Sequence, residues 1–256
     1  MGGKKSRKDA GGGKDTKKFR TVDELWTHMD LVSKGDPYNE ECGWYGQSAV
    51  YWSQVPATVD GVLTGNTHGG DMGKWHEADI EESRQFIESI RDGGRGKCID
   101  CGAGMGRVTR DLLCPLYSRC DVLESQSHML EQAERYLADQ PSAGDFILGR
   151  LESVPLPPRT YDLVFLELAA MYLTDADLVT FLKQAKVSLT KKGFIFLKEN
   201  CAKSDKYDID PEDNGLLRTE GQFAALFQAA GLTMVREAEQ QKWPHDYATL
   251  KMYALR

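Results

Sequence analysis

The stretch that decides the fold is Gly96-Lys-Cys-Ile-Asp-Cys-Gly-Ala-Gly-Met-Gly-Arg107. A short apolar run ends at Asp100, and three glycines at alternate positions, from Gly102 to Gly106, precede an apolar pattern over 108–116 that predicts a helix. A strand, a glycine loop and a helix in this order let backbone N–H groups approach a ligand where a side chain would block them. The stretch therefore predicts a ligand-binding loop.

The glycine spacing distinguishes two kinds of cofactor. The pattern E/D-x-G-x-G-x-G resembles motif I of class I methyltransferases, which bind S-adenosylmethionine (SAM); the rival is the dinucleotide fingerprint G-x-G-x-x-G. Counted from Gly102, the last glycine comes one residue too early for NAD. Glu124 ends a second apolar run 22 positions after Gly102, where both folds place an acidic residue that accepts hydrogen bonds from ribose hydroxyls. Spacing and Glu124 together favour SAM.

Apolar segments with strand character alternate with helical patterns, which implies parallel βαβ units. Strands are predicted near 97–101, 119–123, 145–148, 162–168, 193–199, 232–239 and 247–255, and helices near 107–116, 127–138, 175–189 and 219–230. Only a turn region, 240–244, separates the last two strands, which predicts a terminal hairpin. We therefore expect an α/β fold with the Rossmann-like sheet of class I methyltransferases, which has seven strands, one of them antiparallel. A terminal hairpin of this kind is atypical of dehydrogenases.

The chain divides into three parts. Residues 1–20 form a basic tail, 21–92 a helical N-terminal cap and 93–256 the SAM-binding core. Thr21-Val-Asp-Glu24 is a capping box. Further cap helices are expected around 43–54, 56–65 (opened by Pro56 at its first turn) and 79–92.

Charge is distributed unevenly along the 256 residues. Residues 1–20 hold eight Lys/Arg and two Asp, net +6, which leaves −13 on the other residues of a chain of net charge −7. An acidic body disfavours nucleic acid as the main substrate, because phosphate binding requires a basic face, and suits a cationic substrate. With 41% hydrophobic residues the chain can form one sizeable core, and no apolar run approaches the ~18 residues of a membrane span. We expect a soluble protein without integral membrane association.

The Gly/Lys-rich tail has almost no apolar residue before Phe19 and is predicted to be disordered. Three functions stay open for it. It could be a solubilising or polyanion-binding tail; its run Lys4-Lys5-Ser6-Arg7-Lys8 could direct nuclear import; or Gly2 could be myristoylated, with the basic residues as the second membrane signal.

The six cysteines (42, 98, 101, 114, 120, 201) show no disulfide-framework spacing. Cys98 and Cys101 match C-x-x-C, but strand alternation points their sulfurs to opposite faces, and no second Cys or His pair completes a zinc site. We expect no metal site and reduced thiols, as in the cytoplasm or nucleus.

Beyond motif I, several blocks resemble one family, the eukaryotic protein α-N-terminal methyltransferases, which methylate the free N-terminal amine of proteins beginning X-Pro-Lys or X-Pro-Arg. The opening block is Tyr51-Trp-Ser-Gln-Val-Pro-Ala-Thr-Val-Asp-Gly-Val-Leu63. Further matches are residues 99–104 with Arg107, Lys198-Glu-Asn200, Asp210-x-x-Asp213 and Met252-Tyr-Ala-Leu-Arg256. Several blocks in the correct order, over roughly 45–256, are more specific than any one of them.

The resemblance implies a set of cofactor-binding residues. Gly102, Gly104 and Arg107 would line the methionine end of SAM, and the Arg107 guanidinium would face its carboxylate. Glu124 would hold the ribose. The other implied contacts are Ser125, Gln126, Leu151 and Glu152 at the adenine, Glu167 at the methionine part, and Trp52 in the cap over the site.

On the substrate side, the resemblance implies that Asn200 fixes the substrate backbone. The acidic pair would receive the cationic third residue and the amine; we choose Asp213 as the base and Asp210 for the cation. On this side, Tyr51 and Leu63 belong to the cap. Tyr51 and Trp52 form an aromatic pair in an amphipathic helix, and ordinary packing would explain such a pair equally well.

The segment after the fourth strand departs from the family. Where the family shows Gln-Trp-x-x-x-His, this chain has Glu167, Leu168 in place of the aromatic that packs on the substrate proline, and Tyr172 in place of a histidine that shares the base role. Gly215 replaces a serine. We expect a monomeric SAM-dependent enzyme acting on protein N-termini. A SAM-dependent enzyme with another acceptor and an inactive SAM-binding partner of an active paralogue remain the alternatives, and the retained acidic pair and Asn200 argue against the second.

Overall fold

The computed structural model describes residues 21–33, 36–41, 43–64, 73–203, 206–210, 212–242 and 248–256. The basic tail 1–20 and Cys42 lie outside the described residues, so the predictions made for them remain predictions. None of the helices in the described ranges combines the length and the apolar character needed to cross a membrane.

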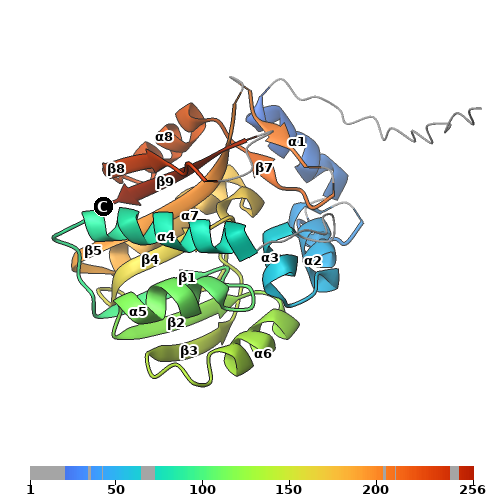
Figure 1. Cartoon of the computed structure of the whole chain (residues 1–256). Helices are drawn as coiled ribbons and strands as arrows, with labels where there is room; N and C mark the ends of the chain where they lie inside the picture. Colours follow the sequence, from blue (N-terminus) through green and yellow to red (C-terminus); the bar gives the residue numbers. More distant parts are fainter. Residues whose placement is uncertain are drawn as a thin grey trace, which may run out of the picture.

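A seven-stranded sheet forms the centre of the molecule, in the order β3-β2-β1-β4-β5-β9-β8 (Figure 1). Its strands are β1 Lys97–Cys101, β2 Arg119–Glu124, β3 Ala143–Leu148, β4 Tyr161–Glu167, β5 Leu189–Ala202, β8 Met234–Glu239 and β9 Ala248–Leu255. Strand β9 runs antiparallel to both of its neighbours, and the pairs among β1 to β5 are parallel. The predicted fold, with a C-terminal hairpin and one antiparallel strand, is confirmed.

Two apolar clusters pack on opposite faces of this sheet. Helices α4 (Gly73–Ser89) and α6 (Ser127–Tyr136) contribute to one cluster, and α7 (Asp175–Ser188) and α8 (Glu220–Ala229) to the other. Strands buried on both faces are apolar along nearly their whole length, as expected for a sheet covered by helices on each side. Cys98 and Cys101 belong to different clusters, which confirms that their sulfurs point to opposite faces.

The N-terminal helices α1 (Val22–Ser33), α2 (Trp44–Gln54) and α3 (Val59–Thr64) gather at one side of the molecule (Figure 1). The Thr21 hydroxyl accepts a hydrogen bond from the Glu24 amide at 3.1 Å, as the capping box predicts. Trp44 fixes these helices to the core, because its indole N–H donates to the Tyr172 carbonyl at 2.6 Å. The Tyr45 hydroxyl likewise donates to Asp177 of α7 at 2.5 Å.

Two predicted helix boundaries differ from the structure. Helix α3 does not open at Pro56, because the Thr58 hydroxyl caps the Gly61 amide at 3.1 Å and so starts the helix after Thr58. Helix α4 spans 73–89 instead of 79–92; Arg95 donates to the Ile87 carbonyl at 3.0 Å and closes its C-terminal end.

Three further features have no counterpart in the predicted elements. The helix after the glycine loop contains a π-helical stretch, η1 (Thr109–Leu113), before α5 (Cys114–Leu116). Two-residue strands β6 (Asp208–Ile209) and β7 (Leu216–Leu217) pair as a separate ribbon, and a 3₁₀ turn, η2 (Ala170–Tyr172), follows β4.

Candidate active site

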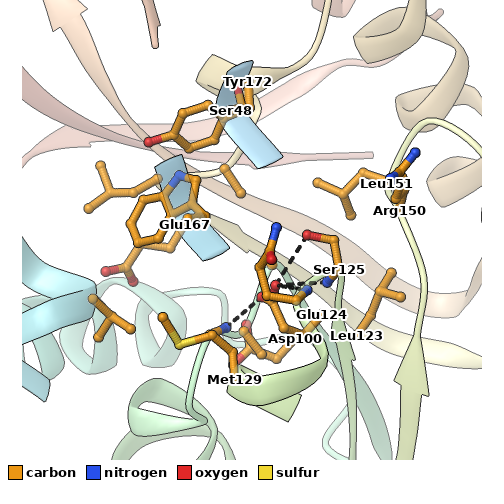
Figure 2. A pocket seen from close by; sticks show the side chains of 18 of the residues that line it. Ser48, Asp100, Leu123, Glu124, Ser125, Met129, Arg150, Leu151, Glu167 and Tyr172 are labelled. Atoms are coloured by element: carbon orange, nitrogen blue, oxygen red, sulfur yellow. Dashed lines mark hydrogen bonds between the residues drawn. The ribbon is translucent and has the colours of Figure 1, made fainter. Parts of the chain in front are cut away.

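A cavity of about 300 Å³ lies where the carboxyl ends of β1 to β4 meet the N-terminal helices. Open parallel sheets bind ligands at this edge. Figure 2 shows Tyr172 and Ser48 well separated from Glu124 and Ser125, with Glu167 to one side and Leu151 with Arg150 to the other. Twelve of the residues predicted for the site line this cavity: Trp52, Gly102, Gly104, Arg107, Glu124, Ser125, Gln126, Leu151, Glu152, Glu167, Leu168 and Tyr172.

The glycine loop brings bare backbone to the cavity. Gly102, Gly104 and Gly106 have φ of 77°, 57° and 84°, a region that favours glycine. A Cβ on Gly102 would lie 2.8 Å from the Ala169 Cβ, so the loop also leaves no room for a side chain. The Gly102 and Ala103 amides donate to the Leu123 carbonyl at 2.9 and 3.1 Å, which ties the loop to β2.

Glu124 ends β2 and organises the wall beside this loop. One carboxylate oxygen accepts from the Gly104 amide at 2.9 Å, and the other accepts from the amides of Ser125 and Gln126 at 2.7 and 2.8 Å. Figure 2 shows the bonds from Ser125. The carboxylate is thus held in one orientation at the cavity wall, which suits an acceptor of ribose hydroxyl hydrogen bonds.

A buried group of alternating charges extends from the wall of the cavity into the core. Arg107 donates to Asp79 at 2.5 Å and to Glu167 at 2.8 Å, and Asp79 also pairs with the Lys198 ammonium. Burial opposes ionisation of Asp79, but Lys198 and Arg107 outweigh it and hold the Asp79 pKa below its ordinary value. Burial and the nearby Asp79 carboxylate raise the pKa of Glu167 to about 7.

Asp79 and Lys198 were not predicted as parts of the site. Each carries a signal in the sequence, because Asp79 falls on the apolar face of α4 with Ser83 and Phe86, and Lys198 ends the apolar run of β5. Both side chains are fully buried. A charge at a buried position implies a partner of opposite charge.

Tyr172 also lines the cavity and lies away from Glu124 in Figure 2. It lies in η2, which begins two residues after Leu168, whose φ of 51° is unusual for a leucine. The Tyr172 hydroxyl donates to one oxygen of Asp213 at 2.6 Å, and the other oxygen accepts from the Gly215 amide at 2.8 Å. Ser48 of α2 donates to the Asp213 carbonyl at 2.7 Å.

Six predicted site residues are not among those that line the cavity: Tyr51, Leu63, Asn200, Asp210, Asp213 and Gly215. Tyr51 packs edge-on against Trp52, with ring centroids 5.5 Å apart, and Val62 lines the cavity in place of its neighbour Leu63. Asn200 is 7% exposed, whereas Asp210 is exposed and accepts from the Glu212 amide at 2.9 Å.

Other cavity residues were absent from the predicted set. Burial raises the pKa of Asp100 to about 6, and its carboxylate accepts from the Thr109 hydroxyl at 2.5 Å. Tyr45 and Ser48 lie on the same helix as Trp52, so an amphipathic reading of α2 could have found them. Arg150 is held over the Tyr38 ring at 4.6 Å, a contact across 112 positions that no local pattern indicates.

The residues present fit SAM. Within the described part of the chain, the buried Oε2 of Glu167 and Nε1 of Trp52 have no hydrogen-bond partner, and both residues line the cavity. Glu167 and Asp100 could face the cationic groups of SAM, Arg107 its carboxylate, and Glu124 its ribose. When bound, SAM supplies an electrophilic methyl group, whose bond to sulfur breaks with the electron pair remaining on sulfur.

Comparison with known proteins identifies the family. A family model described as AdoMet dependent proline di-methyltransferase matches residues 40–256. Alpha N-terminal protein methyltransferase 1 of Caenorhabditis elegans is 33% identical over 216 residues, which cover 83% of this chain and 90% of that protein. Human N-terminal Xaa-Pro-Lys N-methyltransferase 1 is 31% identical over 223 residues, covering 85% and 97%.

A solved structure, of a SAM-dependent methyltransferase from Leishmania major, superposes with a TM-score of 0.85 at 47% identity and covers 93% of this chain and 92% of that one. Sequence and fold thus point to the same activity over most of the chain. The chain belongs to the family of AdoMet-dependent proline di-methyltransferases, and it is a SAM-dependent methyltransferase.

Proposed function

We propose that this enzyme transfers the methyl group of SAM to the free α-amine of proteins that begin X-Pro-Lys or X-Pro-Arg. The observation that carries the proposal is the Tyr172–Asp213 hydrogen bond at the cavity end away from the ribose position, in a chain whose curated relatives are named for N-terminal methylation. The pair offers a proton acceptor beside the space left for an amine.

The chemistry of an α-amine supports this choice of acceptor. Its pKa of about 7.7–8.0 means that deprotonation at pH 7 costs only about 1–1.4 kcal/mol. A lysine ε-amine, with a pKa of about 10.4, would cost nearly 5 kcal/mol. A carboxylate of modest basicity therefore suffices for an N-terminal amine, and orientation toward the methyl group is the larger task.

We assign the acceptor side as follows. Asp213 is the base, exposed Asp210 receives the cationic third residue, and Asn200 at the end of β5 holds the substrate backbone. Leu168 and Tyr172 lie next to the proline position. The enzyme acts as a monomer, which size-exclusion chromatography tests, in the cytoplasm or nucleus. Residues 21–92 form a cap on the core 93–256.

Labelled SAM and a peptide panel test the function. An X-Pro-Lys peptide should accept methyl groups, and the same peptide with an acetylated N-terminus should not. Methylation of both at equal rates would overturn the α-amine assignment and favour another acceptor, such as an internal lysine.

A second arm tests Asp210. Changing the peptide lysine to glutamine should raise KM much more for the wild type than for Asp210→Asn, because in the variant the partner charge is already gone. Equal losses in both would mean that Asp210 does not contact the lysine.

A further inference from the structure

Tyr172 links the Asp213 carboxylate to the cavity. Both Asp213 oxygens are engaged, one by the Tyr172 hydroxyl at 2.6 Å and the other by the Gly215 amide at 2.8 Å. Tyr172 lines the cavity and Asp213 does not. Because the phenolic hydrogen points to Asp213, the phenolic oxygen, which has two lone pairs, can accept a hydrogen bond from a donor on the cavity side, where Trp52 packs edge-on against the ring at 5.9 Å.

The turn that carries Tyr172 is fixed by buried groups on three sides. The Trp44 indole donates to the Tyr172 carbonyl at 2.6 Å, and Glu199 of β5 accepts from the Met171 amide at 3.0 Å. Arg218, fully buried, donates to the carbonyls on either side of the turn, Ala170 and Leu173, at 3.0 and 2.6 Å. These contacts hold the phenol in one place, as a proton-transfer group requires.

We propose that Tyr172 is a catalytic residue that relays the proton of the substrate amine to Asp213, an inference that rests on the proposed function. The substrate N–H bond breaks as the Tyr172 oxygen takes this proton, and the Tyr172 O–H bond breaks as its proton passes to Asp213. Tyr172 ends unchanged, Asp213 ends protonated, and the amine gains a free lone pair.

The charges around the pair support this direction of transfer. Glu199 faces Tyr172 from β5 and Asp210 faces Asp213 from the same turn, so both neighbours are acidic. Burial, with the nearby Asp213, raises the pKa of Tyr172 well above its ordinary value, so Tyr172 remains protonated and relays without acting as a base itself. Burial also raises the pKa of Asp213, which makes it a better proton acceptor.

The test is the pH dependence of kcat/KM on a free X-Pro-Lys peptide for Tyr172→Phe, Asp213→Asn and the double variant. At pH 7 only about a tenth of an α-amine is unprotonated, and at pH 9.5 nearly all of it is. Without the relay the enzyme depends on the amine already free in solution. The ratio of wild-type to Tyr172→Phe activity should therefore fall about tenfold between pH 7 and pH 9.5.

Because Tyr172 and Asp213 would pass on the same proton one after the other, a second expectation follows. Asp213→Asn and the double variant should show the same tenfold change as Tyr172→Phe, because either substitution alone breaks the relay. Tyr161→Phe is the matched control, because Tyr161 donates to Asp121 at 3.0 Å in a buried pair that does not line the cavity. Its ratio to the wild type should not vary with pH.

Several outcomes would overturn the relay. A ratio that is equal at both pH values would leave Tyr172 with a positioning role only, and a loss that appears only in the double variant would make the two groups alternative bases. SAM affinity and melting temperature show whether a variant is folded; if Tyr172→Phe is not, a ratio for Asp213→Asn that is equal at both pH values still overturns the relay. Equal methylation of free and acetylated peptide by the wild type would overturn the function and the relay together. If only the free peptide is methylated but the ratio of wild-type to variant activity is the same at pH 7 and pH 9.5, only the relay is overturned.

Discussion

Replacing Asp79 by Asn should destabilise the enzyme far more than the loss of one surface charge would. Asp79 is fully buried and is the shared partner of two cations, Arg107 at 2.5 Å and the Lys198 ammonium. Arg107 keeps Glu167 as a partner at 2.8 Å, but Lys198, also fully buried, keeps only the Ser83 hydroxyl at 2.8 Å and the Asp79 main-chain carbonyl. The substitution therefore removes the carboxylate that is directly paired with this buried ammonium.

Breaking a buried ion pair by removing one partner costs about 3–5 kcal/mol. For a chain of this size, 1 kcal/mol corresponds to about 2–4 °C, so the melting temperature should fall by roughly 6–20 °C. Asp79→Leu combined with Lys198→Met should lose much less, because apolar replacement of a whole buried pair is close to neutral.

Urea denaturation at pH 7.5 measures these differences. Asp92→Asn is the matched control, since Asp92 forms a two-bond ion pair with Arg256 at 2.7 and 2.9 Å, but its side chain is 71% exposed. Such exposed pairs contribute little. If Asp79→Asn shifts the urea midpoint no further than Asp92→Asn does, the charge of Asp79 is not what stabilises Lys198.

Three further predictions concern the cofactor, the pH response and the tail. Glu124→Ala should weaken SAM binding about tenfold or more, because a hydrogen bond to a charged group contributes about 1.5–3 kcal/mol; unchanged affinity in isothermal titration would remove Glu124 from the site. The Glu167 pKa of about 7 lies above its unfolded value, so the native state binds more protons and stability falls as pH rises from about 5 to 8. In Glu167→Gln this contribution to the pH dependence of the urea midpoint should vanish. A midpoint that falls with pH equally in the variant and the wild type would contradict the prediction. Deleting residues 1–20 should leave peptide turnover intact; loss of turnover in a folded truncated enzyme would place the tail in the active site.

The parts of the site that the sequence predicted are those encoded locally. The glycine loop needs only its own φ angles, and Glu124 lies directly before two of the amides that it binds, those of Ser125 and Gln126. The parallel sheet followed from the alternation of strands and helices, and the antiparallel strand followed from the short turn between the last two strands. Such features depend on short-range spacing and backbone chemistry.

What was missed depends on contacts between distant positions. Lys198 and Asp79 are 119 positions apart, and their pairing follows from where α4 crosses β5, which no local pattern contains. Asp213 and Tyr172 were both predicted as site residues, but the hydrogen bond between them was not, because it depends on the path of the turn after β4. The β6–β7 ribbon has two residues in each strand, too few for a periodic signal.

The strand order has a consequence for how specificity can change over time. The loops after β1 and β3 supply Gly102 and Leu151, and the end of β2 supplies Glu124. The segment after β4 supplies Leu168 and Tyr172. The two groups lie on separate strands, so substitutions in one half need not disturb the other. A lineage could exchange acceptor residues while its cofactor half stays constant, and mutant libraries aimed at new amines belong in 168–173 and 210–215.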